Sequence, residues 1–176
     1  MLLMDKLQSI RVVVNSVLEQ QPDPETRHWG FVHLYGVSAT CVLLAFSRGL
    51  DAQLAAVAGM LHDIWTHKTG DPTDHARFSA LEAEKILENV GGFDSEEIAR
   101  VCAAISRHSD KDALDGGFDE LLKDADVLQH GLNSPAIVEK LLESGQGLPE
   151  ISAPWLRRWK RVSRELGLVQ SGAEDE

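Results

Sequence analysis

Apolar residues recur at helical spacing along almost the whole chain, and this periodicity restricts the fold more than any other feature. The spacing predicts helices over residues 3–20, 26–48, 51–66, 74–89, 94–108, 118–132 and 154–167, and a short helix that starts at Pro135. Proline or glycine separates most of these segments, and we find no alternating strand pattern and no internal repeat. We therefore expect an all-α, single-domain helical bundle.

The size and charge of the chain restrict its function. The 176 residues suit one domain, which we place at residues 1–170, followed by a disordered acidic tail at 171–176. The formal net charge of −11 argues against a protein that coats nucleic acid or binds an anionic membrane, because both attract positively charged surfaces. A small soluble molecule is the expected partner, and a homo-oligomer is compatible with the sequence.

Two local features bear on the compartment. Residues 1–4 are apolar but turn polar at Asp5, which is too short for the apolar region of a signal peptide, and no apolar run approaches the ~18 residues of a transmembrane helix. Cys41 and Cys102 lie among apolar residues, which predicts buried free thiols rather than a disulfide framework. We expect a soluble cytoplasmic protein.

Several of the seven histidines fall on apolar helical faces with carboxylates nearby. His33 lies on the apolar face of its predicted helix. His62 lies on a stripe of small residues, Ala55, Ala58 and Gly59, which allows a neighbouring helix to approach closely. A single histidine in such a place is most often a hydrogen-bonded core residue, but several of them together with carboxylates indicate a metal site.

The adjacent pair His62-Asp63 is the centre of this predicted site. Neighbouring side chains on a helix point ~100° apart, so both can bind one ion only at the edge that they share, and other helices must supply further ligands. His33 and an acid from residues 123–128 are the candidates. Two imidazoles and two carboxylates leave positions open for water, as in a catalytic site. Mixed nitrogen and oxygen ligands suit Mn, Fe, Co, Ni or Zn better than Mg.

The ordered motifs His33-x-x-x-Val37, Ala55 through Leu61-His62-Asp63, and Ala125-Asp126-x-Leu128 resemble the HD superfamily of metal-dependent phosphohydrolases. Segments that begin at His75, Ile105 and Leu122 are similar to its smaller stand-alone bacterial members. The resemblance covers about residues 28–132 and implies an all-α fold. It also implies that the metal ligands are His33, His62, Asp63 and Asp126.

Two acids of the 118–132 helix, Asp124 and Asp126, are candidates for the same metal ligand. Asp124 lies nearer than Asp126 to the apolar stripe of this helix, which consists of Leu121, Ala125, Leu128 and Leu132. We assign the ligand to Asp126, because it matches the Ala-Asp-x-Leu motif of the family. Asp124 is then expected either behind the ligands or, equally, on the solvated surface.

The resemblance further implies one or two metal ions. His75 and His108 are in the right order to hold a second metal or the substrate phosphate, although each would also suit a helix end, stabilised by local hydrogen bonds or the helix dipole. We predict Asp63, His75 and His108 as catalytic residues. Lys111 and Lys123 are predicted to contact the substrate phosphate.

The remaining histidines and the last helix carry less information. A functional and a structural role are equally expected for His67, and a structural or surface role is expected for His28. His130 follows Asp126 by four residues and either orients it or is a surface residue. The basic residues of 154–167 are expected to form a solvated face.

Together these features predict hydrolysis of a phosphomonoester or phosphoanhydride of a nucleotide or similar small molecule. A bound metal would lower the pKa of water from about 15.7 towards ~7 and so supply the nucleophile. The G-x-x-x-x-G-K-[ST] phosphate loop is absent from the sequence. Two alternatives remain, which are a di-iron oxygenase with the HD fold and a nucleotide-binding module without catalysis. No residue signature identifies the substrate.

Overall fold

The structure is a computed structural model that describes residues 6–144 and 151–169, and over these residues it is helical and has no strands. The predicted tail at 171–176 lies outside this part of the chain. The helices are α1 (Lys6–Glu19), α2 (Pro24–Arg48), α3 (Ala52–Leu61), α4 (Ile64–Thr69), α5 (His75–Val90), α6 (Ser95–Arg107), α7 (Gly117–Asn133), α8 (Pro135–Ser144) and α9 (Ala153–Glu165). The all-α prediction is confirmed.

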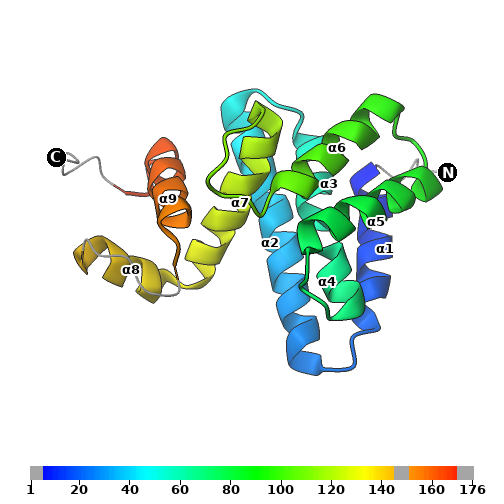
Figure 1. Cartoon of the computed structure of the whole chain (residues 1–176), viewed down its shortest axis with the longest axis horizontal. Helices are drawn as coiled ribbons and strands as arrows, with labels where there is room; N and C mark the ends of the chain where they lie inside the picture. Colours follow the sequence, from blue (N-terminus) through cyan, green and yellow to red (C-terminus); the bar gives the residue numbers. More distant parts are fainter. Residues whose placement is uncertain (1–5, 145–150, 170–176) are drawn as a thin grey trace.

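Helices α2 and α7 run through the middle of the molecule, with α1 and α3–α6 on one side and α8 and α9 on the other (Figure 1). Helices α2 and α3 pack closely against each other. At Gly59 a Cβ atom would lie 2.9 Å from the Cα of Ser38, so α3 can approach α2 only with glycine there. Ser38 Oγ donates to the carbonyl of Ala56 at 2.9 Å and joins the same two helices. The predicted close approach at the small-residue stripe is confirmed.

Local sequence signals set most helix ends. Asp94 and Glu97 form a reciprocal capping box at the start of α6, as their spacing predicts. Asp51 accepts from the backbone N–H of Leu54 at the start of α3. Gly49 ends α2 with φ of 64°, a left-handed conformation that glycine adopts without steric cost.

The predicted helix over residues 51–66 is interrupted at the His62-Asp63 pair. Asp63 has φ −115° and ψ 18°, outside the helical region, and it begins the separate short helix α4. The hydroxyl of Ser79, on α5, accepts the backbone N–H of Trp65 at 3.2 Å. The interruption therefore depends on a contact between helices, and it frees the Asp63 side chain from the direction that a continuous helix would impose.

Helix α2 departs from the expectation that no segment is long and apolar enough to cross a membrane. One window of 18 residues has a mean hydropathy of 1.6, so α2 passes as a candidate span by length and composition alone. Its buried residues, which include His33, Val37 and Leu44, lie in a helix that packs against α3 and α7. The core helix of a soluble protein passes the same test, so α2 is weak evidence for a membrane span.

A buried ionic cluster around Asp124 connects α9 to α2 and α7. The Asp124 carboxylate is 1% exposed and accepts hydrogen bonds from Arg48 at 2.7 Å, Arg158 at 3.2 Å and Arg161 at 2.6 Å. Arg158 is itself buried and also donates to Glu120 at 2.6 Å. The expectation of a solvated basic face on the last helix is therefore wrong for Arg158. Asp124 is not a surface acid either, and its hydrogen bonds go to arginines.

Candidate metal centre

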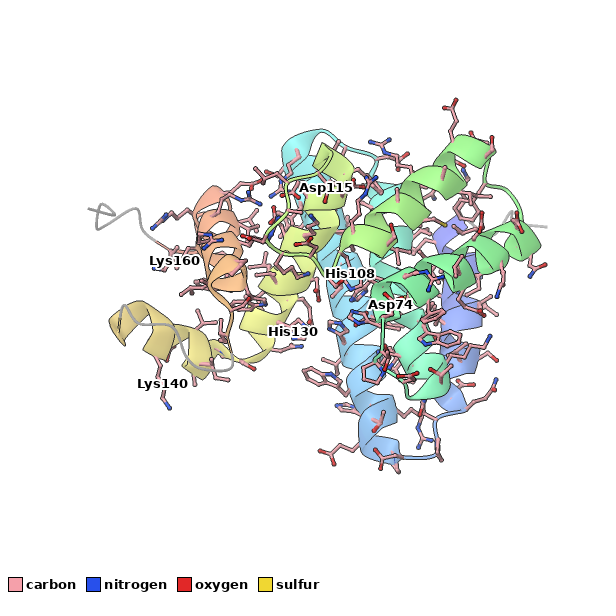
Figure 2. The ribbon with its side chains drawn as sticks, viewed as in Figure 1. Asp74, His108, Asp115, His130, Lys140 and Lys160 are labelled. Atoms are coloured by element: carbon pink, nitrogen blue, oxygen red, sulfur yellow. The ribbon has the colours of Figure 1, made fainter. Side chains whose placement is uncertain are left out.

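Five segments of the chain bring the predicted ligands together in the middle of the bundle. Helix α2 supplies His33, the α3–α4 junction supplies His62 and Asp63, and α7 supplies Asp126. His75 comes from the first residue of α5, and His108 directly follows α6. Ligand atoms within 4.8 Å of one another form two overlapping groups, which are His33, His62 and Asp126, and His62, Asp63 and His108. Figure 2 shows His108 and His130 near the same central region.

The hydrogen bonds of four imidazoles fix which nitrogen faces the centre. In each ring Nδ1 lies within hydrogen-bond distance of an amide oxygen. Because such an oxygen can only accept a hydrogen bond, Nδ1 carries a hydrogen. In a neutral ring, Nε2 then has a free lone pair. The acceptors are Gln129 Oε1 for His33 (2.9 Å), Gly59 O for His62 (2.8 Å), Pro72 O for His75 (3.2 Å) and Ile105 O for His108 (2.7 Å). This second hydrogen bond is typical of histidines that bind a metal.

In the first group of ligand atoms, the two histidine nitrogens have the spacing of ligands to one ion, and the Asp126 oxygen lies slightly farther from each of them. His33 Nε2 and His62 Nε2 lie 3.1 Å apart, and each lies 3.7 Å from Asp126 Oδ1. Two atoms that each lie ~2.1 Å from one metal, at angles of about 90–110°, are separated by roughly 3.0–3.4 Å. Two bare nitrogen lone pairs at 3.1 Å repel each other unless a proton or a metal ion lies between them. The His33–His62 contact therefore favours a cation.

The two oxygens of Asp63 face different pairs of imidazoles. Oδ2 lies 3.4 Å from His33 Nε2 and 3.5 Å from His62 Nε2, whereas Oδ1 lies 3.3 Å from His108 Nε2 and 3.6 Å from His75 Nε2. Asp63 Oδ1 is buried without a hydrogen-bond partner. A carboxylate in this position can bridge two cations, and it gives His75 and His108 a place in a second metal site.

Asp126 is held by a lysine on the side away from the histidines. Lys111 donates from Nζ to Asp126 Oδ2 and to the carbonyl of His108, both at 2.7 Å. The other oxygen, Asp126 Oδ1, faces His33 and His62 and is buried without a hydrogen-bond partner. An acceptor left in this state is costly, and a metal ion would satisfy it. The geometry favours Asp126 over Asp124 as the ligand, because Asp126 reaches the cluster and Asp124 binds arginines.

The charge of the cluster also suits a cation. Burial lowers the pKa of His62 to about 3, so this ring is neutral and able to bind a metal. Burial favours a raised pKa for Asp63, but contacts with His108 and His33 outweigh it and hold the pKa well below the usual range. Burial also favours a raised pKa for Asp126, but the ammonium of Lys111 outweighs it and keeps this carboxylate ionised. Burial opposes protonation of His33, but Asp63 and Asp126 outweigh it and raise its pKa, so positive charge is favoured at this position as well. Imidazole nitrogens together with two ionised carboxylates form a donor set that fits a divalent transition metal.

Two residues outside the predicted site adjoin it. Gln129, one turn after Ala125 on α7, holds Nδ1 of His33 and donates from Nε2 to the carbonyl of Val32 at 3.4 Å. His130 Nε2 lies 3.4 Å from Asp126 Oδ1, and its ring centroid lies 4.7 Å from that of His33. The spacing of four residues from Asp126 signals His130, but no sequence signal pairs Gln129 with His33.

Other predicted residues lie elsewhere. The ammonium of Lys123 is fully buried and binds Asp115 at 2.6 Å, Glu120 at 3.2 Å and the carbonyl of Ala113. These bonds tie Lys123 to the segment between α6 and α7, so we no longer assign it to the substrate phosphate. His67 is buried on α4, and His28 is exposed, which fits a surface role.

Gln129 offers a test of how the first group is oriented. Replacing Gln129 by leucine keeps the side-chain size but leaves His33 Nδ1 without its acceptor, so the ring is free to turn or change tautomer. Loss of such a partner typically weakens metal affinity about 10–100-fold. Competition with a chelator of known affinity measures this change. The matched control is Leu132→Ala, an exposed change near the end of the same helix, and equal affinities of both variants and the wild type would contradict this role.

Comparison with known protein families agrees with the geometry. The HD domain model matches residues 30–131, more than half of the chain and a range that contains all six ligand candidates. No curated protein and no solved structure matches the chain. Most members of the matched family are metal-dependent phosphohydrolases. With the helical fold and the His–Asp cluster, this match shows that the chain belongs to the HD-domain family.

Proposed function

We propose that the chain is a metal-dependent phosphohydrolase that cleaves a phosphomonoester or phosphoanhydride of a nucleotide or similar small phosphorylated molecule. The observation that carries the proposal is the Asp63 carboxylate, whose two oxygens face two different imidazole pairs. His33, His62, Asp63 and Asp126 would hold one ion, and Asp63, His75 and His108 a second. When bound, such ions acidify a water molecule and offset negative charge on the phosphoryl oxygens.

The residues of the chain divide the remaining work. Asp63 is 22% exposed at its side chain, so it lies at the open side of the cluster, where it can orient the attacking water. His75 is 31% exposed and is the more accessible of the two outer histidines, so as an alternative to holding the second ion it could, with Nε2 protonated, donate a proton to the leaving group. The Lys111 ammonium, 13% exposed, lies beside Asp126 and can contact a phosphate oxygen while it positions that carboxylate.

The test combines metal analysis with a phosphate-release screen. We expect the purified protein to contain Mn, Fe, Co, Ni or Zn, and to release phosphate from nucleotides when one of these ions is present. His62→Ala should lose both properties, because His62 belongs to both groups of ligand atoms. His28→Ala is the matched control, since His28 is exposed on the same chain. A metal-free protein that hydrolyses phosphoesters, or an active His62→Ala, would contradict the proposal.

A di-iron oxygenase is the second candidate. Asp63 faces both pairs of histidines, and a cluster of nitrogen and oxygen ligands would also suit two irons. Oxygen uptake by the iron-loaded protein without phosphate release would favour it. A binding module without catalysis is less suited to a cluster whose carboxylate and His75 are partly open to solvent.

A cytoplasmic location is part of the same proposal. Cys41 is buried and Cys102 is half-buried, and both are free thiols. Free cysteines are typical of a reducing compartment. A small phosphorylated metabolite, rather than a nucleic acid or a membrane, is the proposed partner, and the net charge of −11 supports that choice.

A further inference from the structure

A cavity of about 350 Å³ lies beside the His–Asp cluster, between the end of α7, α8 and the start of α9. Its lining includes His130, Gly131, Ile137, Val138, Ile151 and Trp155. This volume lies within the range of small-molecule sites, roughly 300–1,000 Å³. None of the six metal-ligand candidates lines it, so it is a separate space from the metal centre.

One imidazole ring separates the cavity from the metal centre. His130 lines the cavity, and its Nε2 lies 3.4 Å from Asp126 Oδ1. Its ring centroid lies 4.7 Å from that of His33, and its side chain is 45% exposed. A molecule with a phosphoryl group at the cluster can therefore extend past His130 into the cavity.

The chemistry of the cavity differs from that of the cluster. Its lining combines the apolar side chains of Ile137, Val138, Ile151 and Trp155 with the neutral polar side chains of Ser134 and Ser152 and with His130, and no carboxylate, lysine or arginine lines it among the described residues. A lining without carboxylates, lysines or arginines suits an uncharged group better than a charged one. Trp155 is half-buried, so part of its indole is available for stacking.

Gly131, which lines the cavity, also lets α9 pack closely on α7. A Cβ atom at Gly131 would collide with Nε1 of Trp159, the buried tryptophan one turn after Trp155. Trp159 thus packs directly on the backbone of α7, which fixes α9 and places Trp155 at the cavity. Ile137, on α8, is 43% exposed, so its apolar surface is available to a ligand in the cavity.

We propose that this cavity is the subsite for an uncharged aromatic ring on the substrate, of the size of a nucleobase, while the phosphate lies at the His–Asp cluster. This inference rests on the proposed phosphohydrolase function and names the part of the substrate that gives it specificity. Trp155 stacks on the ring, and Ile137 covers its edge. A purely aliphatic phosphate ester such as glycerol phosphate would gain nothing from this subsite.

Binding of nucleosides without phosphate tests the subsite independently of catalysis. The four common ribonucleosides are titrated by calorimetry into the full chain treated with a chelator. We expect at least one to bind, and Trp155→Ala to weaken that binding about tenfold or more, because stacking of a base on an aromatic residue contributes substantially to affinity. Ile137→Asp should weaken it as well, and it changes an exposed position that contributes little to folding. Leu132→Ala is the control, since Leu132 is 55% exposed on α7 and does not line the cavity.

The outcomes separate the subsite from the proposed reaction. If no nucleoside binds, or if both cavity variants bind as well as the wild type, the subsite is contradicted. If nucleosides bind in a Trp155-dependent way but no phosphate ester is hydrolysed, the subsite holds and the phosphohydrolase proposal fails. In an active enzyme, the ratio of kcat/KM for a nucleoside monophosphate over that for glycerol phosphate should fall about tenfold in both cavity variants. An unchanged ratio would contradict the subsite while leaving the reaction in place.

Discussion

Replacing Asp63 by alanine is expected to reduce phosphate release by about 1,000-fold or more. Substitution of a residue that only hydrogen-bonds to a metal ligand typically lowers metal affinity or activity by ~10–100-fold. Asp63 faces both proposed ion positions directly, so a larger loss is expected. The fold should survive, because Asp63 begins α4 without a side-chain capping bond. Initial rates of phosphate release, helical circular dichroism and metal content per chain measure the three parts of this expectation.

Asp112→Asn is the matched control for this variant. Asp112 is 73% exposed, and its ion pair with Arg157 lies on the surface. Its rate and metal content should equal those of the wild type. An Asp63→Ala protein with full activity would rule out the proposed mechanism, and one with lost helicity would show that Asp63 also supports folding.

Replacing Asp124 by asparagine is expected to lower the free energy of unfolding by about 3 kcal/mol, with metal binding retained. Removing one partner of a buried ion pair leaves the others uncompensated and typically costs ~3–5 kcal/mol. We expect the lower end of this range, because Arg48 retains its ion pair with Glu165 and Arg158 retains its ion pair with Glu120. Urea unfolding followed by circular dichroism measures the loss, and a chelator competition measures the metal affinity.

Asp126→Asn completes this comparison on the same helix. The two acids are two residues apart, but Asp124 faces arginines and Asp126 faces imidazoles. Asp126→Asn should lose metal binding, whereas Asp124→Asn should keep it. The opposite result, metal lost with Asp124→Asn and kept with Asp126→Asn, would exchange the roles of the two residues.

Helices and their ends could be predicted because their signals are local. The capping box at Asp94 and Glu97 and the glycine at position 49 act within one turn of the chain. The interruption at His62-Asp63 could not, because no proline or glycine marks it there. It relies on the hydroxyl of Ser79, which lies on a different helix.

The ligand choice on α7 shows the limit of a helical wheel. The wheel assumes one buried face, but α7 is enclosed by neighbours, and every residue from Leu121 to Gln129 is buried. Leu132, which the wheel places on the same apolar stripe, is 55% exposed. The motif of the family identified Asp126, and the structure explains why Asp124 is buried too.

The remaining contacts of the site link residues far apart in the sequence. Gln129 holds His33 across 96 positions, and the residue type alone gives no hint of it. The sequence predicts a phosphate contact for Lys111 but not its hydrogen bond to Asp126, which lies 15 positions away. Both contacts depend on how α2, α6 and α7 pack together, and the periodicity of apolar residues in the sequence does not specify that packing.

Anomalous X-ray diffraction from crystals grown with Mn²⁺ tests the metal centre most directly. We expect one anomalous peak at His33, His62 and Asp126, and a second at His75 and His108, with Asp63 between the two. The absence of any peak within about 2.5 Å of these imidazole nitrogens, with the rings bonded only to one another, would contradict this expectation.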